Sequence, residues 1–166
     1  MAAPEREVYV MVGDGSYLMM NSEIATSIQE GYKLTIVLLD NHGFASIGGL
    51  SESLGSAGFG TRYRFRDPQT GQLNGEVLPV DLAANARSLG ADVIEAADLP
   101  ALKNALEEAR SRTRTTVIVV ETDREQRVPG YESWWDVPVA EVSEIEAVQR
   151  ARAEYEHNLK KERRHL

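Results

Sequence analysis

The sequence contains no cysteine among its 166 residues, which excludes disulfide bonds and cysteine-ligated metal sites. It also lacks any apolar run near the ~20 residues that span a bilayer, and residues 1–7 do not resemble a secretory leader. We therefore predict a cytoplasmic protein. Acidic residues exceed basic ones, giving a formal net charge of −8 and a pI of about 4.9. Such a chain is a poor general binder of nucleic acid or anionic membrane, so we expect neither as a partner.

Hydrophobic residues make up 42% of the chain, enough to build the core of one ordinary domain. Runs of β-branched and other apolar residues predict strands at 8–12, 34–39, 91–95 and 116–121. Helical spacing predicts helices at 18–28, at 82–89 after an Asp81 cap, and after an Asp98 cap. The alternation predicts an α/β fold, a doubly wound, mostly parallel sheet with helices on both faces.

The segment 41–75 separates two of these units and is rich in glycine, serine and turn signals. We predict a long loop there, and a connection of this length is often functional. After residue 140, Ser143 and Glu146 predict a capping box for a final helix. Its expected side-chain pairs are Glu146–Arg150 and Glu156–Lys160. We divide the chain into an α/β domain at 1–140 and a charged C-terminal helix at 141–166.

Polar clusters end the first two predicted strands. The first cluster is Gly13-Asp14-Gly15-Ser16, and the second is Asp40-Asn41-His42-Gly43. Carboxyl ends of parallel strands meet at one edge of a sheet, where ligands bind. A carboxylate, an amide oxygen and a main-chain carbonyl are ligands that suit Mg²⁺, which also takes phosphate oxygens.

The glycines around Asp14 would let a diphosphate approach the backbone N–H groups that open the next helix. We expect Asp14 itself to be an exposed loop carboxylate that contributes little to the core. The alternative for this cluster is an ordinary Asp-Gly turn. His42 either faces a substrate or is a solvated loop histidine.

Two further features carry open alternatives. Trp134 and Trp135 either cover the active site or a subunit contact, or pack on the domain's own sheet. The basic residues near the C-terminus fit a solvated helix end better than an anion site; they are Lys160, Lys161, Arg163 and Arg164.

The pattern GDG-S…N-x-G-[FY] resembles the thiamine diphosphate signature of the acetolactate synthase and pyruvate decarboxylase superfamily. The resemblance implies a partial thiamine diphosphate-binding domain at 1–140, truncated at its N-terminus. It implies Mg²⁺ ligands at Asp14, the Asn41 side chain and the main-chain oxygen of Gly43. It also implies cofactor contacts, which would come from Gly13, Asp14, Gly15, Ser16, Asn41, Gly43 and Phe44.

Two positions depart from the superfamily pattern. Asp40 stands where many members have asparagine, but the ligand is the following residue. Residues 45–47, Ala-Ser-Ile, lack the glutamate that pyruvate decarboxylases carry just past the motif. This difference argues against a simple 2-oxo acid decarboxylase.

A closer resemblance covers nearly the whole chain. The segments VYVMVGDGSYLMMNSEI, LLDNHGFASIGGL and VPGYESWWDVPVAEVS are similar to the trihydroxycyclohexane-1,2-dione hydrolases of myo-inositol catabolism. This resemblance implies opening of the cyclic dione, a small-molecule substrate, to 5-deoxy-glucuronate. It further implies a homo-oligomer, dimer or tetramer, in which a neighbouring subunit supplies the N-terminal pyrimidine-binding domain and its activating glutamate.

On this reading the chain is a C-terminal fragment with no catalytic residue of its own, inactive alone. Two alternative functions remain open at this point. One is an acetolactate synthase-like carboligase or decarboxylase, which keeps the cofactor. The other is a non-catalytic, flavodoxin-like signalling domain modified at Asp40.

Overall fold

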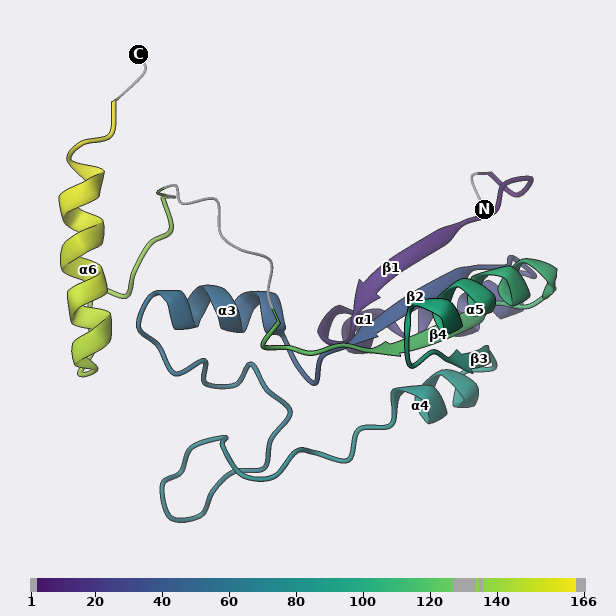
Figure 1. Ribbon diagram of the computed structural model, residues 1–166, viewed down its shortest axis with the longest axis horizontal. Helices are drawn as coiled ribbons and strands as arrows, with labels where there is room; N and C mark the ends of the chain where they lie inside the picture. The colour runs from purple at the N-terminus through teal and green to yellow at the C-terminus, as the bar shows by residue number, and fades with distance from the viewer. Residues whose placement is uncertain (1–2, 127–133, 135, 164–166) are drawn as a thin grey trace.

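The computed structural model describes residues 3–126, 134 and 136–163. At its centre is a four-stranded sheet with strand order β1-β2-β4-β3 (Figure 1). Neighbouring strands are parallel throughout, so their carboxyl ends share one edge. The strands are β1 (Tyr9–Gly13), β2 (Thr35–Asp40), β3 (Asp92–Glu95) and β4 (Thr116–Glu121). The predicted parallel α/β sheet is confirmed.

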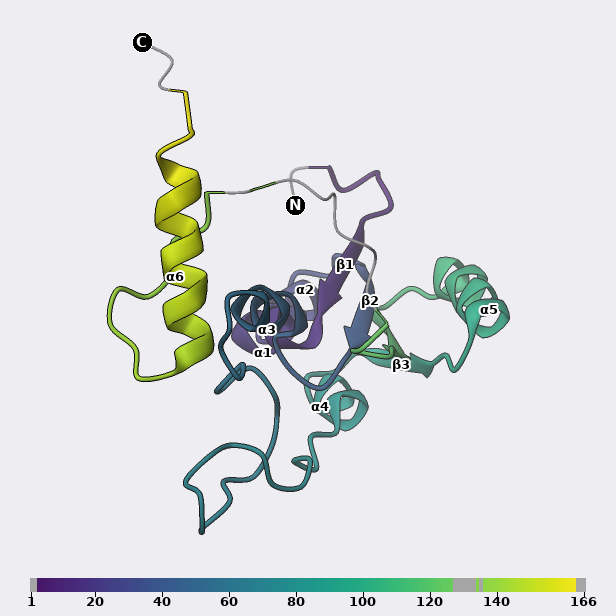
Figure 2. The same cartoon turned by 60° about the vertical axis from the view of Figure 1, so that its left-hand side comes forward.

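Helices cover both faces of this sheet, as predicted. One core cluster joins Ile36, Leu38 and Val117 of the sheet to helices on the first face. These helices are α1 (Asp14–Met20), α2 (Glu23–Gln29) and α4 (Leu82–Ser88). On the second face, α5 (Leu99–Ser111) packs Ala105 and Ala109 against the sheet. Figure 2 shows α5 across the sheet from α1 and α2.

The predicted helix caps at Asp81 and Asp98 are confirmed. The Asp81 carboxylate accepts a hydrogen bond from the Ala84 N–H at 2.7 Å, and Asp98 accepts one from the Ala101 N–H at 2.7 Å. Each bond satisfies a backbone donor that the first helical turn leaves unpaired. These caps therefore fix where α4 and α5 begin.

The prediction of one continuous helix over residues 18–28 was wrong. Two helices form instead of one. Helix α1 begins directly at Asp14, and the chain turns between Met20 and Glu23 before α2 begins. At this turn the Asn21 side chain donates to Asn85 Oδ1 at 3.0 Å, which ties the break to α4. The Asn21 side chain thus makes a tertiary contact with α4 at the break between α1 and α2.

Segment 41–75 was also predicted wrongly, because it contains the helix α3 (Ala45–Ser53). Its sequence includes two adjacent glycines, which lower helix propensity by about 1 kcal/mol each. Gly48 has no room for a side chain, because an added Cβ would lie 2.4 Å from Arg124 Nη2. A small residue is therefore needed there.

The last helix, α6 (Glu146–Leu159), does not begin with the predicted capping box. Its N-cap is Ile145, and Ser143 Oγ accepts the N–H of Ile145 itself at 3.1 Å. Glu146 is therefore the first helical residue and pairs with Arg150 at 2.6 Å, as predicted. Glu156 pairs with Arg152 at 2.8 Å rather than with the predicted lysine.

Helix α6 stands beyond α3, away from the sheet (Figure 1). Trp134 lies beside Tyr155 of this helix, with ring centroids 6.3 Å apart. It therefore packs on α6 and not on the sheet, while Trp135 and Arg164 lie outside the described residues. No helix in the described part of the chain is long and apolar enough to cross a membrane.

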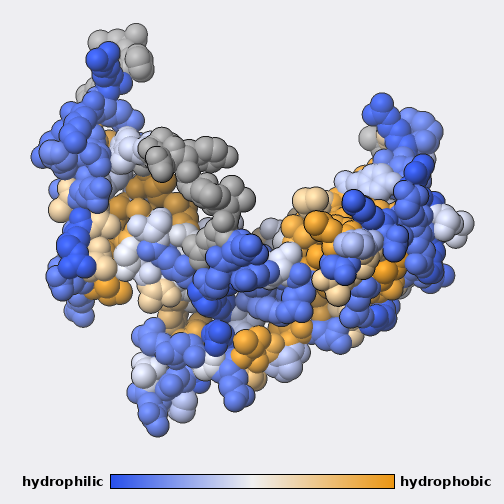
Figure 3. Space-filling view, in the orientation of Figure 1, coloured by the Kyte–Doolittle hydropathy of each residue, from blue (hydrophilic) through white to orange (hydrophobic). Residues whose placement is uncertain are grey.

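Strand β1 forms an edge of the sheet and leaves apolar side chains uncovered. Met11 is 75% exposed, and Tyr9 on the same face is about half exposed. On α1, Met19 and Met20 are also exposed. Figure 3 shows apolar residues gathered over this end of the sheet.

Candidate functional site

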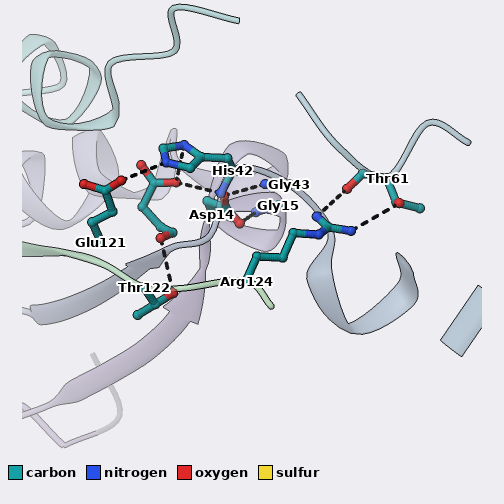
Figure 4. Close-up of polar contacts among 9 residues, drawn as sticks. Asp14, Gly15, His42, Gly43, Thr61, Glu121, Thr122 and Arg124 are labelled. Carbon is teal, nitrogen blue, oxygen red and sulfur yellow. Dashed lines mark hydrogen bonds and ion pairs between the residues drawn. The ribbon is translucent and has the colours of Figure 1, made fainter. Parts of the chain in front are cut away.

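The two predicted polar clusters come together at the carboxyl edge of β1 and β2. These strands are adjacent, with Gly13 in register with Leu39. The Gly43 N–H donates to Asp14 Oδ2 at 2.8 Å, which joins the first cluster to the second (Figure 4). The fold thus brings two segments, far apart in sequence, to one place.

Asp14 is buried, with 0% of its surface exposed, so the expectation of an exposed carboxylate was wrong. Its carboxylate accepts the Gly15 N–H at 2.8 Å as well as that of Gly43. Burial raises the pKa of Asp14, and the nearby Asp40 carboxylate raises it further, while the two N–H donors lower it. The second loop closes over Asp14, which is why the residue is not exposed.

The polar atoms here fit a divalent cation. The side-chain oxygen Oδ1 of Asn41 is buried and has no hydrogen-bond partner within the described residues. A buried polar atom without a partner is unfavourable, so an additional ligand would satisfy it. The Asp40 carboxylate lies close enough to Asp14 to raise the pKa of Asp14. A bound cation would relieve that repulsion.

The atoms available as metal ligands at this site are oxygens. Among the described residues, no group of three or more histidine, cysteine, aspartate or glutamate side chains could hold a metal ion. The candidate site therefore depends on a few carboxylates together with amide and main-chain oxygens. Such a set suits Mg²⁺, which keeps water and phosphate oxygens among its ligands.

Two glycines in the motifs are required by space or by backbone conformation. A Cβ on Gly15 would lie 2.6 Å from the Phe44 ring, which packs directly over this glycine. Gly43 has φ of +149°, and a Cβ there would lie 2.3 Å from the Thr61 main-chain oxygen. Both positions therefore exclude larger residues. At Gly13 an added Cβ would meet nothing within 4 Å.

Ser16, the remaining residue of the predicted cofactor set, is exposed on the first turn of α1. The Phe44 ring also contacts Tyr63 edge-to-face, at 6.2 Å between centroids. Burial raises the pKa of Tyr63 to about 12, with Asp14 and Asp40 adding to the rise. An aromatic pair thus closes one side of the site.

His42 is held between two carboxylates. Its Nε2 lies 3.1 Å from Glu121 Oε1, and its Nδ1 lies 3.3 Å from Asp40 Oδ1. The backbone at His42 has φ of +58°, and its N–H donates to Asp40 Oδ1 at 3.0 Å. The ring is 45% exposed, so it is neither freely solvated nor buried.

Beside this histidine lies a hollow of about 690 Å³ at the same edge of the sheet. Its lining includes Asp40, Asp81, Leu82, Glu95, Val119 and Glu121. The walls are mixed, since carboxylates alternate with apolar side chains. The hollow thus shares Asp40 with the second cluster, and Glu121 of its lining contacts His42 of that cluster.

The sequence reasoning missed a third segment at this site, residues 61–63. The Phe44 N–H donates to the Thr61 carbonyl at 2.9 Å, and the Tyr63 N–H donates to the His42 carbonyl at 3.1 Å. Arg124, after β4, donates to the same Thr61 carbonyl at 3.0 Å (Figure 4). The position of Arg124 just past the carboxyl end of a strand was the one available signal.

Known proteins share both the sequence and the fold of this chain. Residues 1–120 match the family model described as "Thiamine pyrophosphate enzyme, C-terminal TPP binding domain". The chain is 42% identical over 163 residues to "3D-(3,5/4)-trihydroxycyclohexane-1,2-dione hydrolase 2" of Bacillus cereus, covering 98% of this chain and 25% of that protein. It is 44% identical over 160 residues to a Clostridium botulinum protein named "3D-(3,5/4)-trihydroxycyclohexane-1,2-dione hydrolase", covering 96% and 24%.

Solved structures agree on the fold. Benzoylformate decarboxylase from Polynucleobacter necessarius superposes with a TM-score of 0.58 at 27% identity, over 76% of this chain and 21% of that one. A thiamine diphosphate-dependent 4-hydroxybenzoylformate decarboxylase of Rhodococcus jostii gives 0.57 at 21% identity, over 74% and 21%. The chain spans about a quarter of the length of the curated relatives that it matches.

Proposed function

This chain belongs to the thiamine pyrophosphate enzymes, and from that premise we propose that it supplies the cofactor-binding part of a hydrolase acting on trihydroxycyclohexane-1,2-dione. The proposed reaction opens the ring of the dione to 5-deoxy-glucuronate in inositol catabolism. One observation carries the proposal: the Asp14–Gly43 hydrogen bond joins the two clusters, and Asn41 beside it has a buried oxygen without a partner among the described residues.

Mg²⁺ is the proposed metal, with ligands from Asp14, the side chain of Asn41 and the main-chain oxygen of Gly43. The oxygen donors, the partnerless amide oxygen and the proximity of Asp40 support this assignment. The cation would compensate the charge of the buried Asp14 carboxylate. Two backbone N–H groups, those of Gly15 and Gly43, also compensate this charge.

Thiamine diphosphate is the proposed cofactor, with its diphosphate beside residues 13–16 and 41–44. Gly15 leaves room for the Phe44 ring to pack over the first turn of α1, and this ring forms an apolar wall of the proposed site. When bound, the cofactor supplies the electron sink for cleavage of a carbon–carbon bond. The chain's own residues would hold the metal and the diphosphate.

The rest of the catalytic apparatus is proposed to come from outside residues 1–166. We propose a homo-oligomer, dimer or tetramer, in which a pyrimidine-binding domain of a neighbouring subunit completes the site. Residues 1–140 would be the cofactor-binding unit and 141–166 the charged helix. The exposed apolar side chains of β1 and α1 support such a partner surface. The proposed location is the cytoplasm.

The test is a hybrid enzyme in which this chain replaces the matching segment of the Bacillus cereus relative. Turnover of the cyclic dione is followed in the presence of Mg²⁺ and thiamine diphosphate. We expect turnover, and we expect Asp14→Ala in the same hybrid to abolish it. A folded hybrid that binds cofactor but acts only on pyruvate would instead favour the acetolactate synthase-like alternative.

The isolated chain is expected to be inactive on the dione, even with excess cofactor and Mg²⁺. It would hold only one end of a flexible anionic ligand, which gives weak binding. Product formation by the purified chain at a rate near that of the hybrid would show that the catalytic group lies within these residues.

A further inference from the structure

The loop that carries Asn41 and Gly43 is supported by a short segment far along the chain. Residues 61–63 pair with 42–44 as an isolated antiparallel bridge between Gly43 and Arg62. Two backbone hydrogen bonds flank this bridge, at 2.9 and 3.1 Å. A pairing this short is marginal unless other contacts hold it in place.

Arg124 provides such contacts. Its Nη1 donates to the Thr61 carbonyl at 3.0 Å, and Nη2 lies 3.4 Å from Thr61 Oγ1. The carbonyl of Thr61 also accepts the Phe44 N–H, so one oxygen joins the arginine to the loop. Thr61 is buried, and a hydrogen bond from an ionised donor is stronger there than at the surface.

The guanidinium also occupies the space beside the loop. A Cβ on Gly43 would lie 3.1 Å from Nη1, and one on Gly48 would lie 2.4 Å from Nη2. The arginine therefore lies between the Gly43 loop, the helix α3 and Thr61. Its planar, permanently charged group suits this flat, two-donor contact better than a lysine would.

The backbone just before Arg124 is hydrogen-bonded to the end of β2. The Thr122 N–H donates to the Asp40 carbonyl at 2.8 Å, directly after β4 and β2 end. Next to Arg124, the carboxylate of Glu125 contacts Arg62 at 3.1 Å. The segment after β4 thus contacts the loop's start at Asp40 and its supporting residues 61–62.

We propose that Arg124 is a positioning residue for the cofactor loop. It holds Thr61 in place, and through the Thr61 carbonyl it keeps the Gly43 loop against Asp14. The inference rests on the proposed function only for the identity of the ligand. It adds the third strand end, that of β4, to a site built from the ends of β1 and β2.

The first test is amide hydrogen exchange, measured by NMR on the metal-free chain. We expect Arg124→Ala to speed exchange at the Gly43, Phe44 and Tyr63 amides by about tenfold, the effect of losing one charged hydrogen bond. Amides within β2 and β4 should keep their protection. Arg124→Lys should restore part of it, because an ammonium can still donate to the Thr61 carbonyl.

The matched control is Arg152→Ala. Arg152 also donates to a backbone carbonyl, that of Val139, at 2.9 Å, but it lies on α6. This change should leave the Gly43 amide unaffected. Unchanged exchange at Gly43 in Arg124→Ala, or an equal rise across the β2 and β4 amides, would overturn the proposal.

The second test is binding of thiamine diphosphate with Mg²⁺ to the same variants, followed by the shift of the Gly15 amide. Affinity should fall about tenfold in Arg124→Ala, less in the lysine variant, and not at all in Arg152→Ala. Unchanged affinity in Arg124→Ala would overturn the proposal. Faster loop exchange in Arg124→Ala, together with a folded hybrid enzyme that does not turn over the dione, would support the positioning role and refute the proposed function.

Discussion

Replacing Asp14 with alanine tests whether the buried carboxylate holds the site together before any ligand binds. Its two hydrogen bonds, to the N–H groups of Gly15 and Gly43, both measure 2.8 Å. Bonds to an ionised group contribute about 1.5–3 kcal/mol each, so the two give an upper limit of about 3–6 kcal/mol. Burial and the nearby Asp40 raise the pKa of Asp14 and offset part of this. We expect a net loss of about 1–3 kcal/mol in the free energy of unfolding.

The assay is urea denaturation of the metal-free chain at neutral pH, followed by circular dichroism. Asp67→Ala is the matched control, because Asp67 also accepts two backbone N–H groups, from Gln69 and Thr70, but in an exposed turn. The control should lose clearly less stability. If Asp14→Ala is as stable as the parent chain, or no less stable than the control, then the reasoning about its buried hydrogen bonds is refuted.

Three further outcomes are expected. Asn41→Ala should leave the stability of the metal-free chain unchanged or slightly higher in urea denaturation, since the buried Asn41 oxygen lacks a partner among the described residues. The same change should remove Mg²⁺-dependent cofactor binding, which calorimetric titration measures. Gly43→Ala should destabilise the chain by about 2 kcal/mol or more, because its Cβ would meet the Thr61 oxygen; an unchanged urea midpoint would contradict this. Burial raises the pKa of Tyr63 to about 12, above the ordinary 10. The contribution of this residue to stability is therefore complete below pH 10 and is lost as the pH rises from 10 to about 12. Tyr63→Phe should lack that loss in unfolding measured across this range.

Local signals in the sequence were enough to predict the sheet. Strand β2 is buried over most of its length and reads as an apolar run on both faces, which is typical of a covered parallel strand. Asp81 and Asp98 cap their helices through bonds that span only three residues. Features set by neighbours in the chain were therefore visible without the structure.

Features set by distant contacts were not visible. Helix α3 contains glycines that local propensity disfavours, and the reason for Gly48 is a distant one, since it must leave room for Arg124. Asp14 is buried because the Gly43 loop, which lies 29 positions away, closes over it. The Arg124–Thr61 contact spans 63 positions and has no local signature. The ligand candidates could be named from the strand ends, but the residues that hold them in place could not.

The register of β1 and β2 limits which changes of chain length the protein can tolerate. Gly13 pairs with Leu39, and Asp40 pairs with Glu121 of β4, so each polar cluster begins at a fixed step of the ladder. An extra residue in the turn at 31–33 would leave those pairings intact. Deleting one residue within β2 would bring Asn41 to the step of Asp40 and reverse the face of the β2 side chains after the deletion. Variation in length should therefore be permitted between the strands and forbidden inside them.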